Sequence, residues 1–214
     1  MREHQRTAAL LVGIVLALSA AFVAGPAQGR NPGRPLERVR DIRLPGRSSR
    51  FDYQSIDAAG RRLYVAHLGD STLDVIDLDT LAVTATVPDL RGVHGVLAAP
   101  EIGRVFVSAT GTDELVTVDA SSDQVIARTP TGEFPDGIAY SPHDDLVLVS
   151  NKDAGSETII EGRSGQVVRT VHLGREVGNV AYDSSGALAY VAVVHPTKSS
   201  PSMPPAARSL TGFA

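Results

Sequence analysis

The sequence repeats one short apolar segment at a fixed interval. Leu63-Tyr64-Val65 returns as Val105-Phe106-Val107, Val147-Leu148-Val149 and Ala189-Tyr190-Val191, and each copy begins 42 residues after the one before it. Self-similarity at a constant period of this size is typical of repeat architectures. Because the repeated core is a short run of apolar and β-branched residues, the repeated unit is predicted to be a sheet.

Each repeat divides into four short runs separated by turn residues. The predicted strands are residues 53–57, 63–67, 73–77 and 82–87, then 95–98, 105–109, 115–119 and 124–129, then 137–140, 146–151, 158–161 and 167–171, and finally 180–182 and 188–193. Four strands joined by tight turns form an antiparallel meander, and a period of about 40–45 residues is that of a propeller blade. A β-sandwich also contains many short strands, but it does not keep one register through several periods.

The predicted fold is therefore all-β, an incomplete β-propeller over residues 37–193. Its repeats are residues 51–92, 93–134, 135–176 and 177–193, which amount to about three and a half blades. Residues 39–44 alternate apolar and polar side chains and fit the register of an outer fourth strand. We therefore predict that they form the N-terminal strand that closes the last blade of a ring.

The first 29 residues have the order of a secretory signal peptide. Arg2, His4 and Arg6 precede an apolar run over residues 8–23, and Ala27-Gln28-Gly29 has the small-residue form of a cleavage site. An uncleaved membrane anchor is the alternative, but the run is shorter than the ~20 residues of a spanning helix. Residues 30–36, with two prolines, are predicted to be a linker. Either way the domain is exported, to the periplasm or the extracellular space.

The sequence of residues 194–214 does not match the repeat. It is rich in Pro and Ser, a composition that predicts disorder. Back-translation of residues 197–203 with the frame shifted by two bases can encode Glu-Val-Val-Ala-Ile-Asp at positions 198–203, where the repeat requires its third strand. We therefore predict a frameshift near residues 193–197 and a truncated product. Its open blade edges would favour self-association.

Three segments resemble the YVTN-type β-propeller repeat family, the YncE-like exported proteins. They are LYVAHLGDSTLDVIDLDTLAVTATV, VFVSATGTDELVTVDASSDQVIART and FPDGIAYSPHDD, and the resemblance covers residues 37–193. It implies a secreted or periplasmic propeller, seven-bladed in most members, with roles in binding, surface interaction or DNA contact. The Tyr-Val-Thr-Asn core itself occurs only in degenerate forms such as Tyr64-Val-Ala-His67, and fewer blades are present.

Polar side chains recur where the innermost strand of each blade begins and its neighbour ends. Because these two strands are antiparallel, both positions lie at one rim of the central channel. Reading them at the 42-residue interval gives a candidate ligand-binding rim of Asp52, His67, His94, Asp136 and Asn151. Carboxylates and imidazoles there could hold a divalent cation or bind a polar substrate. The alternative is turn chemistry, with Asp136 capping its own loop and Gly95 and Gly137 supplying unusual dihedral angles.

No catalytic motif is recognised in the sequence. It has no Gly-x-Ser-x-Gly elbow, no His-Glu-x-x-His and no Gly-rich phosphate loop. Asp77, Asp119 and Glu161 also recur at 42 residues, but each ends a third strand and is expected to accept hydrogen bonds from its turn. The absence of Cys excludes disulfides and a thiolate site, and the net charge of −4 gives no basic surface for nucleic acid.

The function predicted from these features is that of an exported, non-enzymatic propeller that binds an unknown small molecule or protein through its top rim. The alternative is a propeller enzyme, either a metal-dependent hydrolase or lactonase or a relative of quinoprotein dehydrogenases, since propellers host both classes. The sequence names no cofactor and no metal, and no membrane span remains once the signal peptide is removed.

Overall fold

The computed structural model describes residues 37–194 and the backbone of residues 206–210. Residues 1–36, which contain the predicted signal peptide and linker, lie outside the described part. The chain divides into two units, residues 1–40 and residues 41–214, and every described strand belongs to the second. Within the described residues the regular structure consists of β-strands and three single-turn 3-10 helices, Leu68–Asp70, Pro100–Ile102 and Thr110–Thr112. No described helix is long and apolar enough to cross a membrane.

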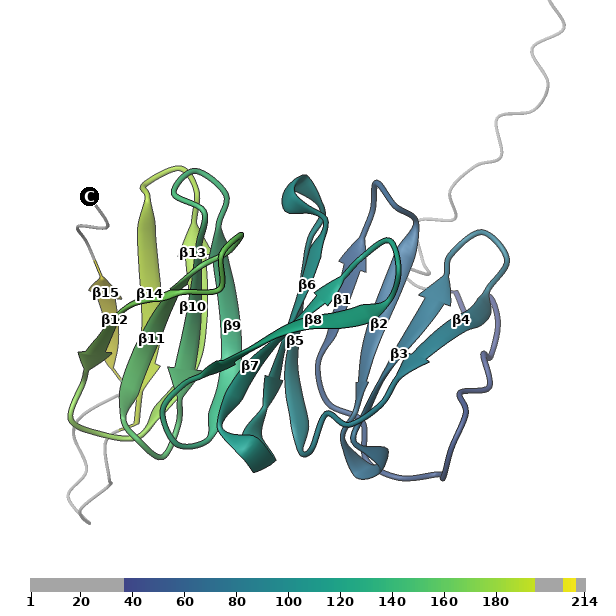
Figure 1. The fold of residues 1–214 in the computed structure, drawn as a ribbon, viewed down its shortest axis with the longest axis horizontal. Helices are drawn as coiled ribbons and strands as arrows, with labels where there is room; N and C mark the ends of the chain where they lie inside the picture. Colours follow the sequence, from purple (N-terminus) through teal and green to yellow (C-terminus); the bar gives the residue numbers. More distant parts are fainter. Residues whose placement is uncertain (1–36, 195–205, 211–214) are drawn as a thin grey trace, which may run out of the picture. The chain divides into compact units, whose positions relative to one another are not determined.

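The strands form four separate antiparallel sheets, one for each repeat (Figure 1). Blade 1 contains β1 (Gln54–Asp57), β2 (Arg62–His67), β3 (Thr72–Asp77) and β4 (Ala82–Val87). Blade 2 contains β5 (Val93–Ala99), β6 (Arg104–Ala109), β7 (Glu114–Asp119) and β8 (Gln124–Pro130). Blade 3 contains β9 (Pro135–Ser141), β10 (Leu146–Asn151), β11 (Ser156–Glu161) and β12 (Val167–His172). Blade 4 contains β13 (Val177–Asp183), β14 (Leu188–Val193) and β15 (Ala206–Leu210).

The pairing of strands keeps the same register from blade to blade. Leu63 lies opposite Ile76 in blade 1, Val105 opposite Val118 in blade 2 and Val147 opposite Ile160 in blade 3. Each sheet is a meander whose strands follow chain order. This confirms the predicted fold class, all-β propeller blades with a 42-residue repeat.

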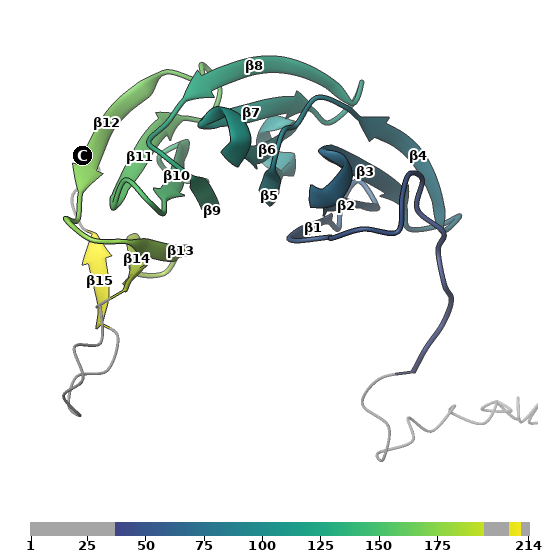
Figure 2. The same ribbon diagram turned by 90° about the horizontal axis from the view of Figure 1, so that it is seen from below.

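Apolar faces of successive blades pack against each other. Tyr64 and Leu73 of blade 1 share one core cluster with Val105 of blade 2, and Phe106 and Leu115 share the next with Val147 and Ile160 of blade 3. A third cluster joins Leu148 to Val191 of blade 4. The first strands β1, β5, β9 and β13 are neighbours in succession and line the inner side of the arc, whereas β4, β8 and β12 follow its outer side (Figure 2).

Residues 39–44 do not form the predicted closing strand. The backbone from residue 37 to residue 50 has no strand in it, and the side chain of Val39 is 86% exposed. A β-strand is stabilised by backbone hydrogen bonds to a neighbouring strand. None of the described strands pairs with this segment, so the alternating pattern alone does not make it a strand.

The prediction of disorder for residues 194–214 is wrong for residues 206–210. These residues form β15, which pairs antiparallel with β14 from Ala189 opposite Leu210 to Val193 opposite Ala206. They take the third-strand place that the repeat assigns to residues 198–203. The open edge of β14 offers unpaired backbone groups to any extended segment that can reach it. Residues 195–205 and 211–214 lie outside the described part, and the frameshift stays a prediction.

The acidic residues that end the third strands act as expected at the turns. Asp77 accepts hydrogen bonds from the backbone N–H groups of Asp79 and Thr80, at 3.0 and 2.7 Å. Asp119 accepts from the hydroxyl and backbone N–H groups of Ser121 and Ser122, which lower its pKa to about 2. Glu161 accepts from the hydroxyl group of Ser164.

One buried carboxyl group breaks the apolar pattern of the repeat. Glu157 occupies the position of Leu73 and Leu115 and is completely buried in β11, on the side that faces blade 4. Its Oε1 accepts a hydrogen bond of 2.5 Å from the Ser150 hydroxyl, but its Oε2 has no partner among the described residues. Burial raises the pKa of Glu157 to about 8.

Replacing this carboxyl group should make the fold less sensitive to alkali. The native pKa of Glu157 lies above its ordinary value of 4.5. The stability that its protonated form contributes is therefore fully present below about pH 4.5, and it is lost as the pH rises toward about 8. In Glu157→Gln, which keeps an acceptor for Ser150, the free energy of unfolding should exceed that of the wild type by a margin that grows by a few kcal/mol over this range. Urea denaturation at several pH values measures this margin. Glu133→Gln, at an exposed position, is the control, and a margin independent of pH would contradict the assignment.

Candidate functional site

The candidate site begins with three ionisable side chains from three successive blades. Asp52 lies two residues before β1, His94 lies in β5 and Asp136 lies in β9. The Nε2 atom of His94 is 3.8 Å from Oδ2 of Asp52, and both residues influence the pKa of Asp136 electrostatically. The structure therefore brings together the three inner-strand positions that the 42-residue interval predicted.

The ring of His94 is held in one orientation. Its Nδ1 lies 2.7 Å from the carbonyl oxygen of Gly92 and 2.9 Å from Oγ1 of Thr110, which itself donates to the carbonyl oxygen of Pro135. Because a carbonyl oxygen only accepts, Nδ1 must carry a proton. The ring also packs at a tilt on Phe134, with centroids 5.3 Å apart. Nε2 is therefore the nitrogen presented toward Asp52, and in the neutral ring it is an acceptor.

Asp136 is a partly buried carboxyl group at this rim with a raised pKa. Its Oδ1 is buried and has no hydrogen-bond partner among the described residues. Burial is the main reason that its pKa is raised, and the negative charge of Asp52 raises it further. His94, Lys152 and Arg50 act in the opposite direction through their positive charge. The carboxyl group is therefore not capping its own loop, as the alternative interpretation expected.

Two further side chains join the rim and were missed by the sequence analysis. Tyr53, one residue after Asp52, donates a hydrogen bond from its hydroxyl group to Oδ1 of Asn179 in blade 4. Burial raises the pKa of Tyr53, and the charges of Asp136 and Asp52 add to that effect. Tyr53 and Asn179 are separated by 126 residues, three full repeats. Both residues would have been found if the 42-residue interval had been counted from residue 53 instead of residue 52.

Glycines at the same repeat position allow the blades to approach closely. A Cβ atom on Gly95 would lie 2.2 Å from the carbonyl oxygen of Asp136, and one on Gly137 would lie 3.0 Å from Cα of Asn179. Neither glycine has a positive φ angle. Their role is therefore close backbone approach between inner strands, not the unusual dihedral angle that the alternative interpretation gave them.

His67 and Asn151 lie at the predicted end of their blades but are directed away from the channel. Tyr64 and Ala66 pack toward blade 2, so His67, which alternates with them along β2, faces the opposite side of its sheet and is 1% exposed. Asn151 is completely buried and donates to Ser156 and Thr158 of its own blade, at 3.1 and 2.8 Å. We define the rim cluster as Asp52, Tyr53, His94, Asp136 and Asn179.

The rim cluster is suited to hydrogen bonding rather than to metal binding. Among residues 37–194 no three His, Asp or Glu side chains are grouped closely enough to hold a metal ion. The cluster offers carboxylate and imidazole acceptors, and two cationic side chains lie at its edge. Arg50 is 3.3 Å from Asp52, and the Nζ atom of Lys152 is 5.1 Å from the centre of the Phe134 ring.

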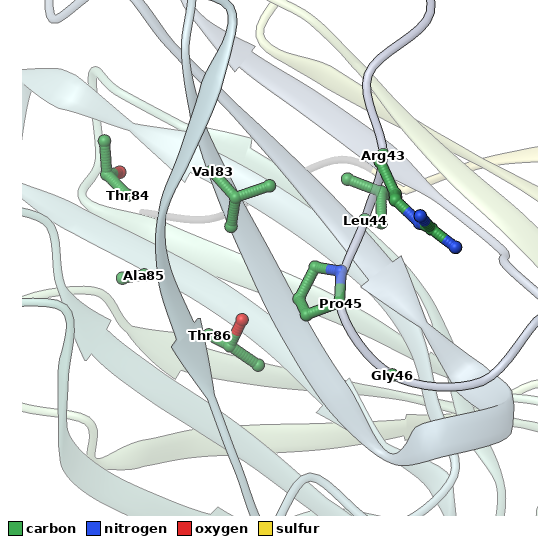
Figure 3. Close-up of a pocket in the computed structure, with 8 residues that line it drawn as sticks. All are labelled: Arg43, Leu44, Pro45, Gly46, Val83, Thr84, Ala85 and Thr86. Atoms are coloured by element: carbon green, nitrogen blue, oxygen red, sulfur yellow. The ribbon is translucent and has the colours of Figure 1, made fainter.

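A separate cavity of about 600 Å³ lies on blade 1. It is formed between residues 43–46 and residues 83–86 of β4 (Figure 3). None of the residues of the rim cluster lines it, and Arg43 is its one charged lining residue among those described. The cavity and the rim cluster are therefore distinct features.

The electrostatic coupling within the rim can be tested by two substitutions with opposite effects. In His94→Ala the pKa of Asp136 should rise further, because the positive charge of His94 lowers it; in Asp52→Asn it should fall, because the carboxylate of Asp52 raises it. Carbon-detected NMR titration of the carboxyl groups measures both. His143→Ala is the control, since His143 is exposed and pairs with Asp144. Equal shifts in all three variants would refute the coupling.

Comparison with known proteins shows the fold but no family. The hydrazine synthase of Kuenenia stuttgartiensis is similar, with a TM-score of 0.66 and 17% sequence identity over 73% of this chain. This chain spans only 44% of that protein's length. No protein-family model matches the sequence. No curated protein matches it either. Because 1093 chains of solved structures match, the fold is widespread and does not by itself select a function.

Proposed function

We propose that this protein is an exported β-propeller repeat protein of the YVTN type that binds a small polar ligand through the rim cluster. The observation that carries the proposal is the buried Oδ1 of Asp136, which has no partner among the described residues where the inner strands of the blades meet. Leaving a buried acceptor unpaired costs about 1–3 kcal/mol, and more when it is charged. A ligand that donates a hydrogen bond to this oxygen recovers that cost.

The chemistry of the cluster indicates the class of ligand. Asp52, Asp136 and the Nε2 atom of His94 are acceptors, so the ligand needs several hydroxyl or amine donors at short spacing. Arg50 and Lys152 at the edge can meet acceptor groups on the same molecule. A polyol or sugar fits this pattern of acceptors and edge donors better than an anion, because two carboxyl groups stand at the centre.

Binding can be tested by calorimetric titration of residues 30–214 with a panel of monosaccharides, disaccharides and linear polyols. Asp136→Asn should weaken the binding of any ligand found by about 10- to 100-fold, since it removes a hydrogen bond to a charged acceptor. Asp183→Asn, which alters an exposed turn of blade 4, is the matched control and should bind as the wild type does. Binding that is unchanged in Asp136→Asn, or no binding by any member of the panel, would contradict the proposal.

Export is supported by the sequence alone, since residues 1–36 lie outside the described part of the structure. The charged, apolar and small-residue order of the first 29 residues is that of a cleavable signal peptide. Material recovered from the periplasm or the medium of an expressing bacterium should begin near Arg30 by N-terminal sequencing. Exported material that begins at Met1 would favour an uncleaved anchor instead.

A further inference from the structure

A serine, a histidine and an aspartate form a linear chain of polar groups on the side of blade 1 that faces away from blade 2. The Oγ atom of Ser49 lies 2.9 Å from Nε2 of His67, and Nδ1 of the same ring lies 3.4 Å from Oδ2 of Asp74. Ser49 is partly exposed, whereas His67 and Asp74 are 1% and 0% exposed. This is the order of a nucleophile, a general base and an orienting carboxylate.

Neighbouring groups fix the aspartate and the histidine of this triad. Oδ1 of Asp74 accepts a hydrogen bond of 2.9 Å from the Thr86 hydroxyl, which leaves Oδ2 to face the ring. Phe51 stacks on His67 with centroids 4.2 Å apart. Nδ1 of His67 and Oδ2 of Asp74 lie 3.4 Å apart, and neither has a hydrogen-bond partner among the described residues. A proton on Nδ1 would face this carboxylate and leave Nε2 to accept the proton of the Ser49 hydroxyl.

The charged groups around His67 are arranged so that Ser49 is its nearest partner at Nε2. Asp70 is the other carboxylate on this side, and its Oδ2 is 3.9 Å from Nε2. Asp70 is held by Arg47, whose backbone N–H and Nε donate to it at 2.7 and 2.8 Å. The hydroxyl of Ser49, at 2.9 Å, is therefore closer to Nε2 than the Asp70 carboxylate is.

The blade fold itself does not require the histidine and the aspartate. Two repeats later, the positions of His67 and Asp74 hold Asn151 and Thr158, whose side chains are hydrogen-bonded at 2.8 Å; one repeat later they hold the apolar residues Ala109 and Val116, both completely buried. Burying an imidazole and a carboxylate costs free energy that these apolar residues do not. Gly69 adds to this specialised packing, since a Cβ atom there would lie 2.3 Å from Oγ of Ser49.

The cavity of blade 1 adjoins the triad on the side of the histidine and the aspartate. Thr86, the donor to Asp74, is one of its lining residues. Gly46 also lines it, and a Cβ atom on Gly46 would lie 3.4 Å from Cε1 of His67. The lining is mostly apolar, with Leu44, Pro45 and Val83, so an acyl chain is the group that it would accept (Figure 3).

We propose that Ser49 is a nucleophile that takes the acyl group of a small carboxylic ester, independently of the rim cluster. The Oγ atom attacks the ester carbonyl, a new Oγ–C bond forms, and the Oγ proton passes to Nε2 of His67. The ester C–O bond then breaks, and the alcohol leaves with that proton. Water then gives a proton to Nε2 of His67 and attacks the acyl carbon, the C–Oγ bond breaks, the acyl group leaves as a carboxylic acid, and Oγ takes the proton back from Nε2. Asp74 is the positioning residue that holds the imidazole in the required tautomer.

The first test uses a fluorophosphonate probe and p-nitrophenyl acetate. Mass spectrometry should locate the phosphonate on Ser49, and Ser49→Ala should abolish both labelling and ester hydrolysis. Ser48→Ala, one residue away and exposed, is the matched control and should label as the wild type does. Asp74→Asn should slow labelling at least tenfold and change its pH profile, because the imidazole loses its orienting partner. Absence of the adduct at Ser49, or equal rates in Asp74→Asn, would overturn the proposal.

A second test does not depend on the stability of buried variants. The chain contains no Cys, so Ser49→Cys and Ser48→Cys each create a single thiol. If His67 acts as a base, iodoacetamide should alkylate Cys at position 49 at least tenfold faster than Cys at position 48 near neutral pH. Gly69→Ala, added to Ser49→Cys, should remove the difference, because it displaces residue 49. Equal alkylation rates at the two positions would show that the three side chains only fasten the segment to the blade.

Discussion

Face-to-face packing of successive blades is the interaction on which the rest of the structure depends. Phe106 and Leu115 project from one blade into the apolar surface of the next, and each such side chain contributes about 1.5–3 kcal/mol when it is fully buried. Single blades expose both faces and cannot bury them alone. Because equivalent positions, with Glu157 as the polar exception, make the contact between successive blades, the packing also fixes the register in which neighbouring blades meet. Tyr190 of blade 4 holds the position that Tyr64, Phe106 and Leu148 hold in blades 1 to 3, and its side chain is 40% exposed.

This packing determines what can gather at the rim. Once the apolar faces are in register, the beginnings of the inner strands converge, and Gly95 and Gly137 let the backbones approach without a Cβ clash. The side chains just before those glycines then share one small volume. Asp136 is partly desolvated there, which is why its pKa is raised even though His94 stands nearby. The rim cluster thus follows from core packing several residues away.

The sequence could predict the blades and three members of the rim cluster because both depend on one period. It could not predict that Tyr53 reaches Asn179, since that contact depends on how far the blades turn between the first and the fourth. His67 and Asn151 were placed at the right end of their strands, but a side chain alternates between the two faces of a sheet, and a period of 42 does not say which face. The strand at residues 206–210 does not lie at the sequence positions that the 42-residue period assigns to a third strand. Its pairing is explained by the open edge of β14.

The repeat also serves as an internal reference for buried polar groups. Where one blade buries a polar side chain and its equivalents are apolar, the free-energy cost is specific to that blade and not to the fold. Glu157 against Leu73 and Leu115 is one such position, whereas His67 has the apolar Ala109 as one equivalent and the polar Asn151 as the next. The two differ in what surrounds them. Glu157 has a single hydrogen-bond partner between the packed blades, so its burial lowers the free energy of unfolding. His67 has the Ser49 hydroxyl 2.9 Å from Nε2 and the Asp74 carboxylate 3.4 Å from Nδ1, and this is the arrangement on which the proposed proton transfer depends.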